Sequence, residues 1–400
     1  MREKLLIEEI IRAIRDVLPE NENLVGLHEP YFGGNEWNYI KKCIDTGWVS
    51  YLGGFVDQFE KALEGFTGVK KAIILVNGTA ALHISLKMAG VGYEDEVMVP
   101  ALTFVATANA VTYCGGVPHF IDSEEKTLGI NPAKLASYLG EIAEIREDGC
   151  FNKKTGRYIR VVIPMHTFGH PVDLDPLADL CRTYGIEMIE DAAESLGSYY
   201  KGRHTGNWGR CSILSFNGNK IVTTGGGGAV LTNDETLGEK IKHLTTTAKI
   251  PHKWEYRHDA VGYNYRLPNI NAALGCAQME ELPHFLEKKR ALASRYEAAL
   301  SDIEGISFFK EPDFASSNYW LNVLLLDHGC VDQRDELLTA AHESNIMMRP
   351  AWTLMHKLPM YKDCPRMDLS TAEDLESRIV NIPSSPALAM KNKKKDKGTL

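Results

Sequence analysis

Short apolar segments alternate with amphipathic segments over residues 69–231, and this alternation constrains the fold more than any other feature. The apolar segments have the length and composition of buried strands, whereas the segments between them repeat apolar residues at helical spacing. The predicted strands are 72–76, 96–99, 117–121, 160–164, 187–190, 211–216 and 228–231, and the predicted helices are 80–89, 104–113, 132–139 and 174–184. This pattern predicts an α/β fold with a mainly parallel sheet covered by helices on both faces.

The segments on either side of this region have other patterns. Residues 4–18 place apolar side chains at helical spacing, so we expect a helical extension over residues 1–25 before a large domain at 26–269. From residue 270 a long helical pattern, two strands and a second helix predict a smaller C-terminal α+β lobe, 270–390. The last ten residues, 391–400, are rich in lysine and predict a disordered basic tail.

Composition limits the class of protein. The 400 residues are 44% hydrophobic and 24% charged, with a net charge of −9, which is typical of a globular protein. Acidic and basic residues are interspersed, so we expect no nucleic-acid partner. No apolar run has the length of a membrane span, and charges interrupt the N-terminal stretch, unlike in a signal peptide. The eight cysteines lack C-x-x-C spacing, which favours a reducing cytoplasm and no zinc site.

Lys220 is the residue with the clearest chemical implication. It follows the predicted strand 211–216 and precedes four glycines, 225–228, which allow the backbone to approach another group closely. The glycines are not followed by Lys-Ser or Lys-Thr, so they do not form a nucleotide P-loop. A lysine amine in such a place can form a Schiff base with an aldehyde. The alternative is an ordinary solvated lysine.

Two further segments would complement this lysine. Asp191 ends the predicted strand 187–190, where a carboxylate could hold a pyridinium nitrogen protonated or cap the next helix. Gly78, Thr79 and Ala80 form the turn between strand 72–76 and the next helix. The backbone N–H groups there suit a phosphate, although Thr is also a common helix cap. An amine, an acid and a phosphate site together are what pyridoxal phosphate (PLP) requires.

A metal site is not expected. His166 and His170 have the spacing of metal ligands on a helix, but Gly169 and Pro171 argue against a helix there. We therefore do not expect this histidine pair to bind a metal ion.

The order of these segments resembles the DegT/DnrJ-type nucleotide-sugar aminotransferases, a branch of the fold-type-I PLP enzymes. The resemblance rests on Gly78-Thr79, Phe104, Asp191, Ser215 and Lys220 in that order, and it runs from about residue 26 to about residue 386. Further similar segments are 164–169, 262–267 and 349–350.

The resemblance implies roles for the residues around the cofactor. Lys220 and Asp191 would be catalytic, and Phe104 would stack over the cofactor ring opposite Ala193. Glu194 would reach the cofactor hydroxyl. The phosphate ligands would be Gly78, Thr79, Ala80 and Ser215.

The resemblance also implies residues farther from the ring. Asn264 would reach the cofactor phosphate of a second subunit, so the protein would be a homodimer with shared active sites. Arg266 and His356 would lie near the substrate.

The implied reaction moves an amino group from L-glutamate, which becomes 2-oxoglutarate, to a nucleotide-linked keto sugar. A 4-keto-6-deoxy-hexose on UDP, made for aminosugars of surface glycans, is the expected acceptor. Two alternatives remain open. A PLP-dependent sugar dehydratase would have histidine in place of Lys220, and a non-catalytic PLP-binding regulator would need an additional DNA-binding or partner module.

Overall fold

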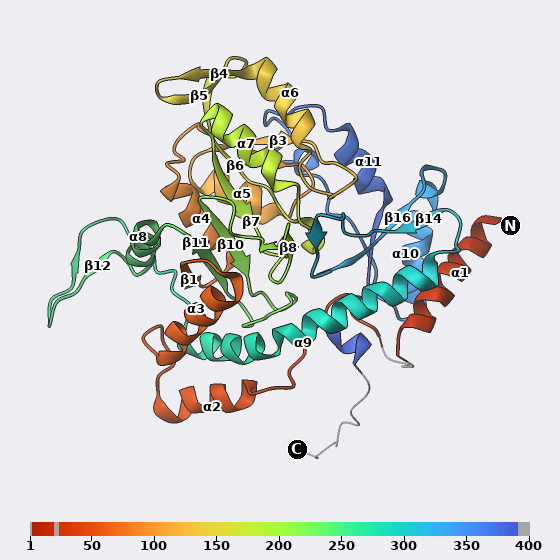
Figure 1. The fold of residues 1–400 in the computed structure, drawn as a ribbon, viewed down its shortest axis with the longest axis horizontal. Helices are drawn as coiled ribbons and strands as arrows, with labels where there is room; N and C mark the ends of the chain where they lie inside the picture. The colour runs from red at the N-terminus through yellow and green to blue at the C-terminus, as the bar shows by residue number, and fades with distance from the viewer. Residues whose placement is uncertain (1, 20–23, 391–400) are drawn as a thin grey trace.

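The large sheet confirms the predicted α/β architecture. The computed structural model describes residues 2–19 and 24–390, and Figure 1 shows its fold. The central strands run in the order β1-β11-β10-β7-β6-β2-β3. Their bounds are β1 Lys71–Leu75, β2 Glu96–Pro100, β3 Val117–Ile121, β6 Arg157–Val162, β7 Glu187–Asp191, β10 Cys211–Ser215 and β11 Gly228–Thr232. From β10 to β3 every neighbouring pair is parallel, while β11 is antiparallel to both β1 and β10.

Helices bury both faces of this sheet. Neighbouring residues of β1 show the two faces, because Ile73 packs into one apolar cluster and Ile74 into another, and both are buried. One face is covered by α4 (Gly78–Met88), α5 (Val105–Tyr113) and α8 (Glu235–Thr245), and the other by α3 (Gly54–Thr67), α6 (Pro132–Ile142), α7 (Leu174–Tyr184) and α9 (Asn269–Leu300). Burial on both faces explains why these strands have nearly continuous apolar sequences.

The sheet also gains two strands from residues 143–152, a segment for which the sequence predicts no strand. β4 (Ala143–Arg146) and β5 (Gly149–Asn152) form a hairpin, and β5 pairs antiparallel with β6. Most side chains of β4 are exposed, so the apolar pattern of a buried strand is absent there.

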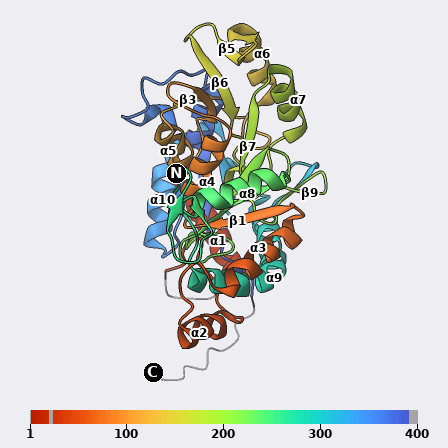
Figure 2. The same cartoon turned by 90° about the vertical axis from the view of Figure 1, so that its left-hand side faces the viewer.

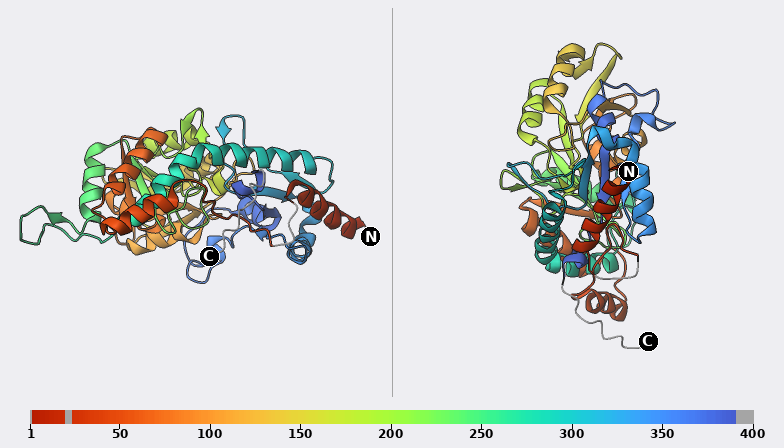
Figure 3. Two further views of the ribbon diagram at one scale, coloured as in Figure 1. Left: turned by 90° about the horizontal axis from the view of Figure 1, so that it is seen from below. Right: turned by 90° about the vertical axis from the view of Figure 1, so that its right-hand side faces the viewer.

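The C-terminal lobe is built on a four-stranded antiparallel sheet, as the predicted α+β lobe requires. Its strands, in spatial order, are β14 Ile306–Phe308, β16 Asn322–Leu326, β18 Ile379–Ile382 and β17 Arg349–Pro350, with helices α10 Arg334–Glu343 and α11 Ser370–Arg378. Helix α9 packs on both lobes, so it belongs to neither lobe alone. The domain boundary that the sequence predicts at residue 269/270 therefore stays a prediction. Figure 3 shows this helix running beside both of them.

The N-terminal helix α1 (Arg2–Val17) packs against α9 and α10. Ile7, Ile10 and Ile14 are buried on one side of α1, in a cluster with Leu292 and Tyr296 of α9. The predicted helix in this segment is therefore present. The predicted basic tail, 391–400, lies outside the described residues.

Smaller elements complete the chain. Helix α2 (Glu36–Thr46) packs on α9, and a three-stranded sheet joins β8 Tyr199–Tyr200, β9 Arg203–His204 and β15 Ala315–Ser316. The hairpin of β12 (Lys249–Ile250) and β13 (Arg257–His258) projects away from the body of the molecule in Figure 1, and Figure 2 views the molecule from that side. Among residues 2–19 and 24–390, no helix is both long enough and apolar enough to cross a membrane.

Candidate active site

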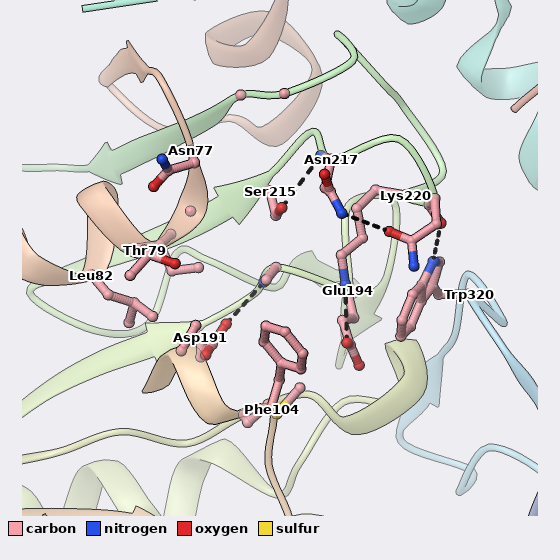
Figure 4. Close-up of a pocket in the computed structure, with 18 of the residues that line it drawn as sticks. Asn77, Thr79, Leu82, Phe104, Asp191, Glu194, Ser215, Asn217, Lys220 and Trp320 are labelled. Carbon is pink, nitrogen blue, oxygen red and sulfur yellow. Dashed lines mark hydrogen bonds and ion pairs between the residues drawn. The ribbon is translucent and has the colours of Figure 1, made fainter. Parts of the chain in front are cut away.

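A cavity of about 380 Å³ opens at the carboxyl ends of β7 and β10. The carboxyl edge of parallel strands is where α/β sheets place their binding sites. Eight of the residues predicted from the sequence line this cavity, and Figure 4 shows several of them: Gly78, Thr79, Phe104, Asp191, Ala193, Glu194, Ser215 and Lys220.

Lys220 lies in the loop after β10, and its amine faces a buried carboxylate. Lys220 Nζ donates to Glu194 Oε1 at 3.0 Å, while Glu194 Oε2 accepts from the backbone N–H of Phe168 at 2.9 Å. Burial raises the pKa of Glu194 to about 7, and the nearby Lys220 opposes this rise. The pair therefore combines a lysine amine with a carboxyl group that titrates near neutral pH.

Asp191 ends β7 and points into the cavity. Its Oδ2 accepts from the Thr107 hydroxyl at 2.7 Å, and its Oδ1 accepts from the Ala193 N–H at 3.2 Å. Burial raises the pKa of Asp191, and the bond from Thr107 is the largest of the opposing effects. A cationic partner in the cavity, such as a protonated ring nitrogen, would offset this cost of burial.

The preceding residue, Glu190, points to the opposite side of the strand, as the pleat of β7 requires. It accepts from the backbone N–H groups of Gly206, Trp208 and Gly209. His166 completes the set at 3.2 Å from Glu190 Oε2. Glu190 is therefore fixed behind the sheet, and Asp191 is the carboxylate available to a ligand.

Thr107 was not predicted as a functional residue. It lies on α5 and shares a hydrogen bond of 2.9 Å with Thr103, which precedes that helix. Their hydroxyl groups therefore meet at the start of this helix. The contact of Thr107 with Asp191, which is distant in sequence, is what connects this pair to the cavity.

The start of α4 forms a cradle with the ends of β10 and β11. Asn77 caps the helix by accepting from the Ala80 N–H at 2.7 Å, so this N–H is already bonded, and Ala80 does not line the cavity. A Cβ on Gly228 would lie 2.5 Å from the Asn77 carbonyl carbon. The close approach brings the Ser215 and Thr79 side chains to the same cavity as the helix N-terminus, which suits a phosphate.

Aromatic side chains form the rest of the wall. Phe104 is half-exposed, and its ring lies 6.3 Å from that of Trp352. Trp320 also lines the cavity. Neither tryptophan was predicted, because an aromatic residue in an apolar segment is more often part of the core.

Three predicted residues lie away from this cavity in the single chain. Asn264 is exposed on the loop after the β12–β13 hairpin, and buried Arg266 pairs with Glu60 at 2.6 Å. His356 pairs with Glu373 at 3.1 Å. Their roles stay predictions.

The two histidines of the segment 166–170 are buried separately. His170 packs its ring against those of Phe309 and Tyr319, and burial lowers its pKa to about 3. Within the described residues, no group of three or more His, Cys, Asp and Glu side chains is arranged to hold a metal ion.

The arrangement fits the cofactor predicted from the sequence. An amine, a buried carboxylate and a helix N-terminus with two hydroxyl groups surround one cavity. Glycine at positions 78 and 228 makes the close approach of α4 possible. A Cβ on Gly78 would lie 3.2 Å from the Ser215 Cβ, and one on Gly228 would lie 2.5 Å from the Asn77 carbonyl carbon.

Comparisons with known proteins agree with this geometry. The sequence profile of the DegT/DnrJ/EryC1/StrS aminotransferase family matches residues 30–395. EpsN from Bacillus subtilis (strain 168), named as a pyridoxal phosphate-dependent aminotransferase, is 39% identical over 362 residues, which are 90% of each chain. A GDP-perosamine synthase from Caulobacter vibrioides is 35% identical over 367 residues, 91% of this chain and 94% of that one. Among solved structures, the aminotransferase TlmJ from Streptoalloteichus hindustanus superimposes with a TM-score of 0.82 at 26% identity, over 92% of this chain and 95% of that one.

Proposed function

We propose a function that proceeds from one fact: this chain belongs to the DegT/DnrJ/EryC1/StrS aminotransferase family and is a PLP-dependent aminotransferase. The proposed reaction transfers the amino group of L-glutamate to a nucleotide-linked 4-keto-6-deoxy-hexose. The observation that carries it is the single cavity in which the Lys220 amine and the Asp191 carboxylate meet the N-terminus of α4.

The cofactor would be held by three parts of this cavity. Gly78, Thr79 and Ser215 would bind its phosphate, Asp191 would keep its ring nitrogen protonated, and Phe104 would stack on the ring. When bound, PLP supplies an aldehyde that condenses with amines and a ring that withdraws electrons from the bond to be broken. Glu194 would contact the cofactor hydroxyl.

Lys220 would be the general base. Its amine would take a proton from the α-carbon of L-glutamate and would later return one to the sugar carbon that receives the nitrogen. Glutamate leaves as 2-oxoglutarate, and the keto oxygen of the sugar leaves as water. The buried Glu194 next to Lys220 gives the amine a partner that can hold a proton between these steps.

The acceptor follows from the cavity and from the relatives. Trp352 lines the cavity next to Phe104, and its aromatic ring suits contact with a sugar ring. The name of the Caulobacter relative refers to a GDP-linked aminosugar, so GDP is the competitor to UDP as the nucleotide.

A homodimer would complete the site. Within residues 2–19 and 24–390, the residues that line the cavity include one cationic side chain, Lys220. The phosphates of a nucleotide sugar therefore need cations from outside this wall, and a second copy of the chain can supply them. Several large aromatic side chains are exposed in the single chain and could be covered by a second copy: Trp37, Trp48, Tyr93, Tyr113, Trp254 and Tyr256. Asn264, on its exposed loop, would reach the phosphate of the neighbouring subunit.

The proposed location is the cytoplasm, where such nucleotide sugars would be made. Six cysteines are buried as thiols, which suits a reducing compartment: Cys43, Cys114, Cys150, Cys181, Cys211 and Cys276.

The test is an assay of the purified protein with PLP, L-glutamate and a panel of UDP- and GDP-linked 4-keto-6-deoxy-hexoses. We expect one 2-oxoglutarate for each aminosugar formed. The mass of the aminosugar should show that the keto oxygen is replaced by an amino group and a hydrogen. Loss of oxygen from the sugar without 2-oxoglutarate would indicate the dehydratase instead. PLP binding without turnover of any sugar would favour the regulator.

A further inference from the structure

The face of the Trp320 ring contacts the Lys220 amine. Lys220 Nζ lies 3.7 Å from the centre of the Trp320 ring, while it also donates to Glu194 at 3.0 Å. The Trp320 residue is 4% exposed and the Lys220 side chain 12% exposed, so water competes little for this contact. A cation over the face of a tryptophan is attracted by the ring, and the attraction grows when both groups are desolvated.

The indole also holds the main chain beside the lysine. Its Nε1–H donates to the carbonyl oxygen of Asn219 at 2.8 Å. Figure 4 shows this bond at the end of the Lys220 loop. One side chain therefore contacts the amine through its face and the preceding residue through its edge.

Asn318 connects the two partners of the amine. Its Oδ1 accepts from the Trp320 N–H at 2.8 Å, and its Nδ2 donates to the Glu194 carbonyl oxygen at 2.8 Å. The Asn318 side chain is closely packed against Gly169, because a Cβ on Gly169 would lie 2.0 Å from Asn318 Oδ1. Tyr319, between Asn318 and Trp320, has a φ of +48°, which is a strained conformation that the surrounding contacts must maintain.

A buried lysine fixes the other end of the tryptophan backbone. Lys289 of α9 donates to the Trp320 carbonyl oxygen at 3.2 Å. Complete burial lowers the pKa of this lysine. Trp320 is therefore held through its N–H, its carbonyl and its indole N–H, which leaves its ring face as the part that meets Lys220.

The two partners of the amine differ in chemistry. The carboxyl group of Glu194 titrates, and burial raises its pKa to about 7. The ring face of Trp320 does not titrate. Through the neutral range, where Glu194 gains or loses its charge, the ring continues to attract the amine.

We propose that Trp320 is a positioning residue for Lys220, which holds the lysine amine beside Glu194 whenever that amine is not bonded to the cofactor. The inference rests on the proposed function only in so far as Lys220 is the catalytic base. Trp320 acts through Lys220 and is not itself catalytic.

The first test measures the amine directly, without amino donor or sugar. The full chain, freed of cofactor, is treated briefly with acetic anhydride, and peptide mass spectrometry gives the acetylation rate of Lys220 relative to the exposed Lys253. Loss of a largely desolvated cation–π contact predicts that Trp320→Leu raises this relative rate roughly three- to thirtyfold. Trp320→Phe should fall in between, because phenylalanine keeps a weaker ring face.

Trp352→Leu is the matched control. It removes a tryptophan from the same cavity, and Trp352 packs on Phe168 rather than on Lys220. If better access of the reagent explained the effect, both leucine variants would raise the rate equally, and the proposal would be wrong. The graded order Trp, Phe, Leu at position 320, with a change of less than about twofold in Trp352→Leu, supports it.

The second test uses the PLP-loaded enzyme and single-turnover loss of its visible absorption band with L-glutamate. If Lys220 is poorly placed, proton removal limits the rate more, so the isotope effect with α-deuterated L-glutamate should rise in Trp320→Leu and partly recover in Trp320→Phe. An unchanged isotope effect and acetylation rate in correctly folded Trp320→Phe and Trp320→Leu would overturn the proposal. An inactive wild type with the acetylation pattern intact would refute the proposed function and leave the positioning role supported.

Discussion

The cavity has two walls of different origin. One wall comes from the ends of β7 and β10 and from the start of α4, the helix that follows β1 of the same sheet. The other wall contains Trp320 and Trp352, which come from the C-terminal part of the chain. In the proposed reaction the sheet wall would supply the groups that bind and react, and the C-terminal wall would orient them. We therefore expect the reactivity of Lys220 on the sheet wall to depend on how Trp320 packs in the C-terminal wall.

The largest expected effect is at Lys220 on the sheet wall. Lys220→Ala removes the proposed general base, and we expect turnover to fall roughly a thousandfold or more while PLP still binds through its phosphate. In the wild type, borohydride should bleach the visible band and attach the cofactor mass to the peptide that contains Lys220. Attachment to another lysine would contradict the assignment.

Asp191 tests the same wall with a smaller change. Asp191→Asn keeps the shape but removes the charge proposed to hold the ring nitrogen protonated. Loss of about 1.5–3 kcal/mol predicts a rate lower by roughly ten- to a hundredfold. Glu190→Gln, on the opposite side of β7, is the matched control for kcat. A normal rate in Asp191→Asn with a slow Glu190→Gln would mean that the other carboxylate serves the cofactor.

Asn264 tests whether two walls are enough. If the loop of one subunit completes the pocket of its neighbour, Lys220→Ala and Asn264→Ala chains should complement each other when mixed. In a two-fold dimer, one pocket of each heterodimer carries both changes and the other carries neither, so activity should recover to about a quarter of wild type. Native mass spectrometry would verify subunit exchange. Exchange without recovery would mean that Asn264 serves its own chain.

The smallest expected effect concerns the boundary between the walls, at Glu194. Burial raises the pKa of this carboxyl to about 7, so the folded, cofactor-free chain binds a proton more tightly than the unfolded chain. Its contribution to stability is present at low pH and is lost as the pH rises from about 4.5 to about 7. Glu194→Gln should flatten the pH dependence of the unfolding free energy in this window, by on the order of 3 kcal/mol at most. Urea titrations at pH 5 and pH 8 would measure it, and parallel curves for both proteins would contradict the expectation.

The two walls also differ in how far the sequence predicts them. Asp191 and Ser215 end apolar strands, and Gly78 and Thr79 start a helix, so local patterns place them at one sheet edge. Trp320 gives no such signal. It lies in an apolar run that predicts a strand over 319–326, whereas β16 begins at Asn322, and the preceding residues bend toward Glu194.

The same reasoning explains the other differences. Thr107 acquires its role from Asp191, 84 residues away, and no local pattern encodes that contact. The β4–β5 hairpin was missed because its side chains are largely polar and exposed, so its pairing depends on the free edge of β6. Arg266 was predicted near substrate, and its buried ion pair with Glu60 depends on a helix some 200 residues earlier. Tertiary contacts decided each of these cases.

The long helix α9 gives the molecule a mechanical property. Its first half packs with Leu282 and Phe285 in the cluster under the large sheet, and its second half packs with Leu292 and Tyr296 in the cluster of the C-terminal lobe. A continuous rod of 32 residues thus joins both lobes, and no flexible linker lies between them along this path. The two lobes also share an apolar cluster, in which Trp320 and Leu321 pack with residues of the large sheet. The softest point of the rod is near Pro283, where a proline removes one backbone hydrogen bond, so we expect any bending of α9 to concentrate there.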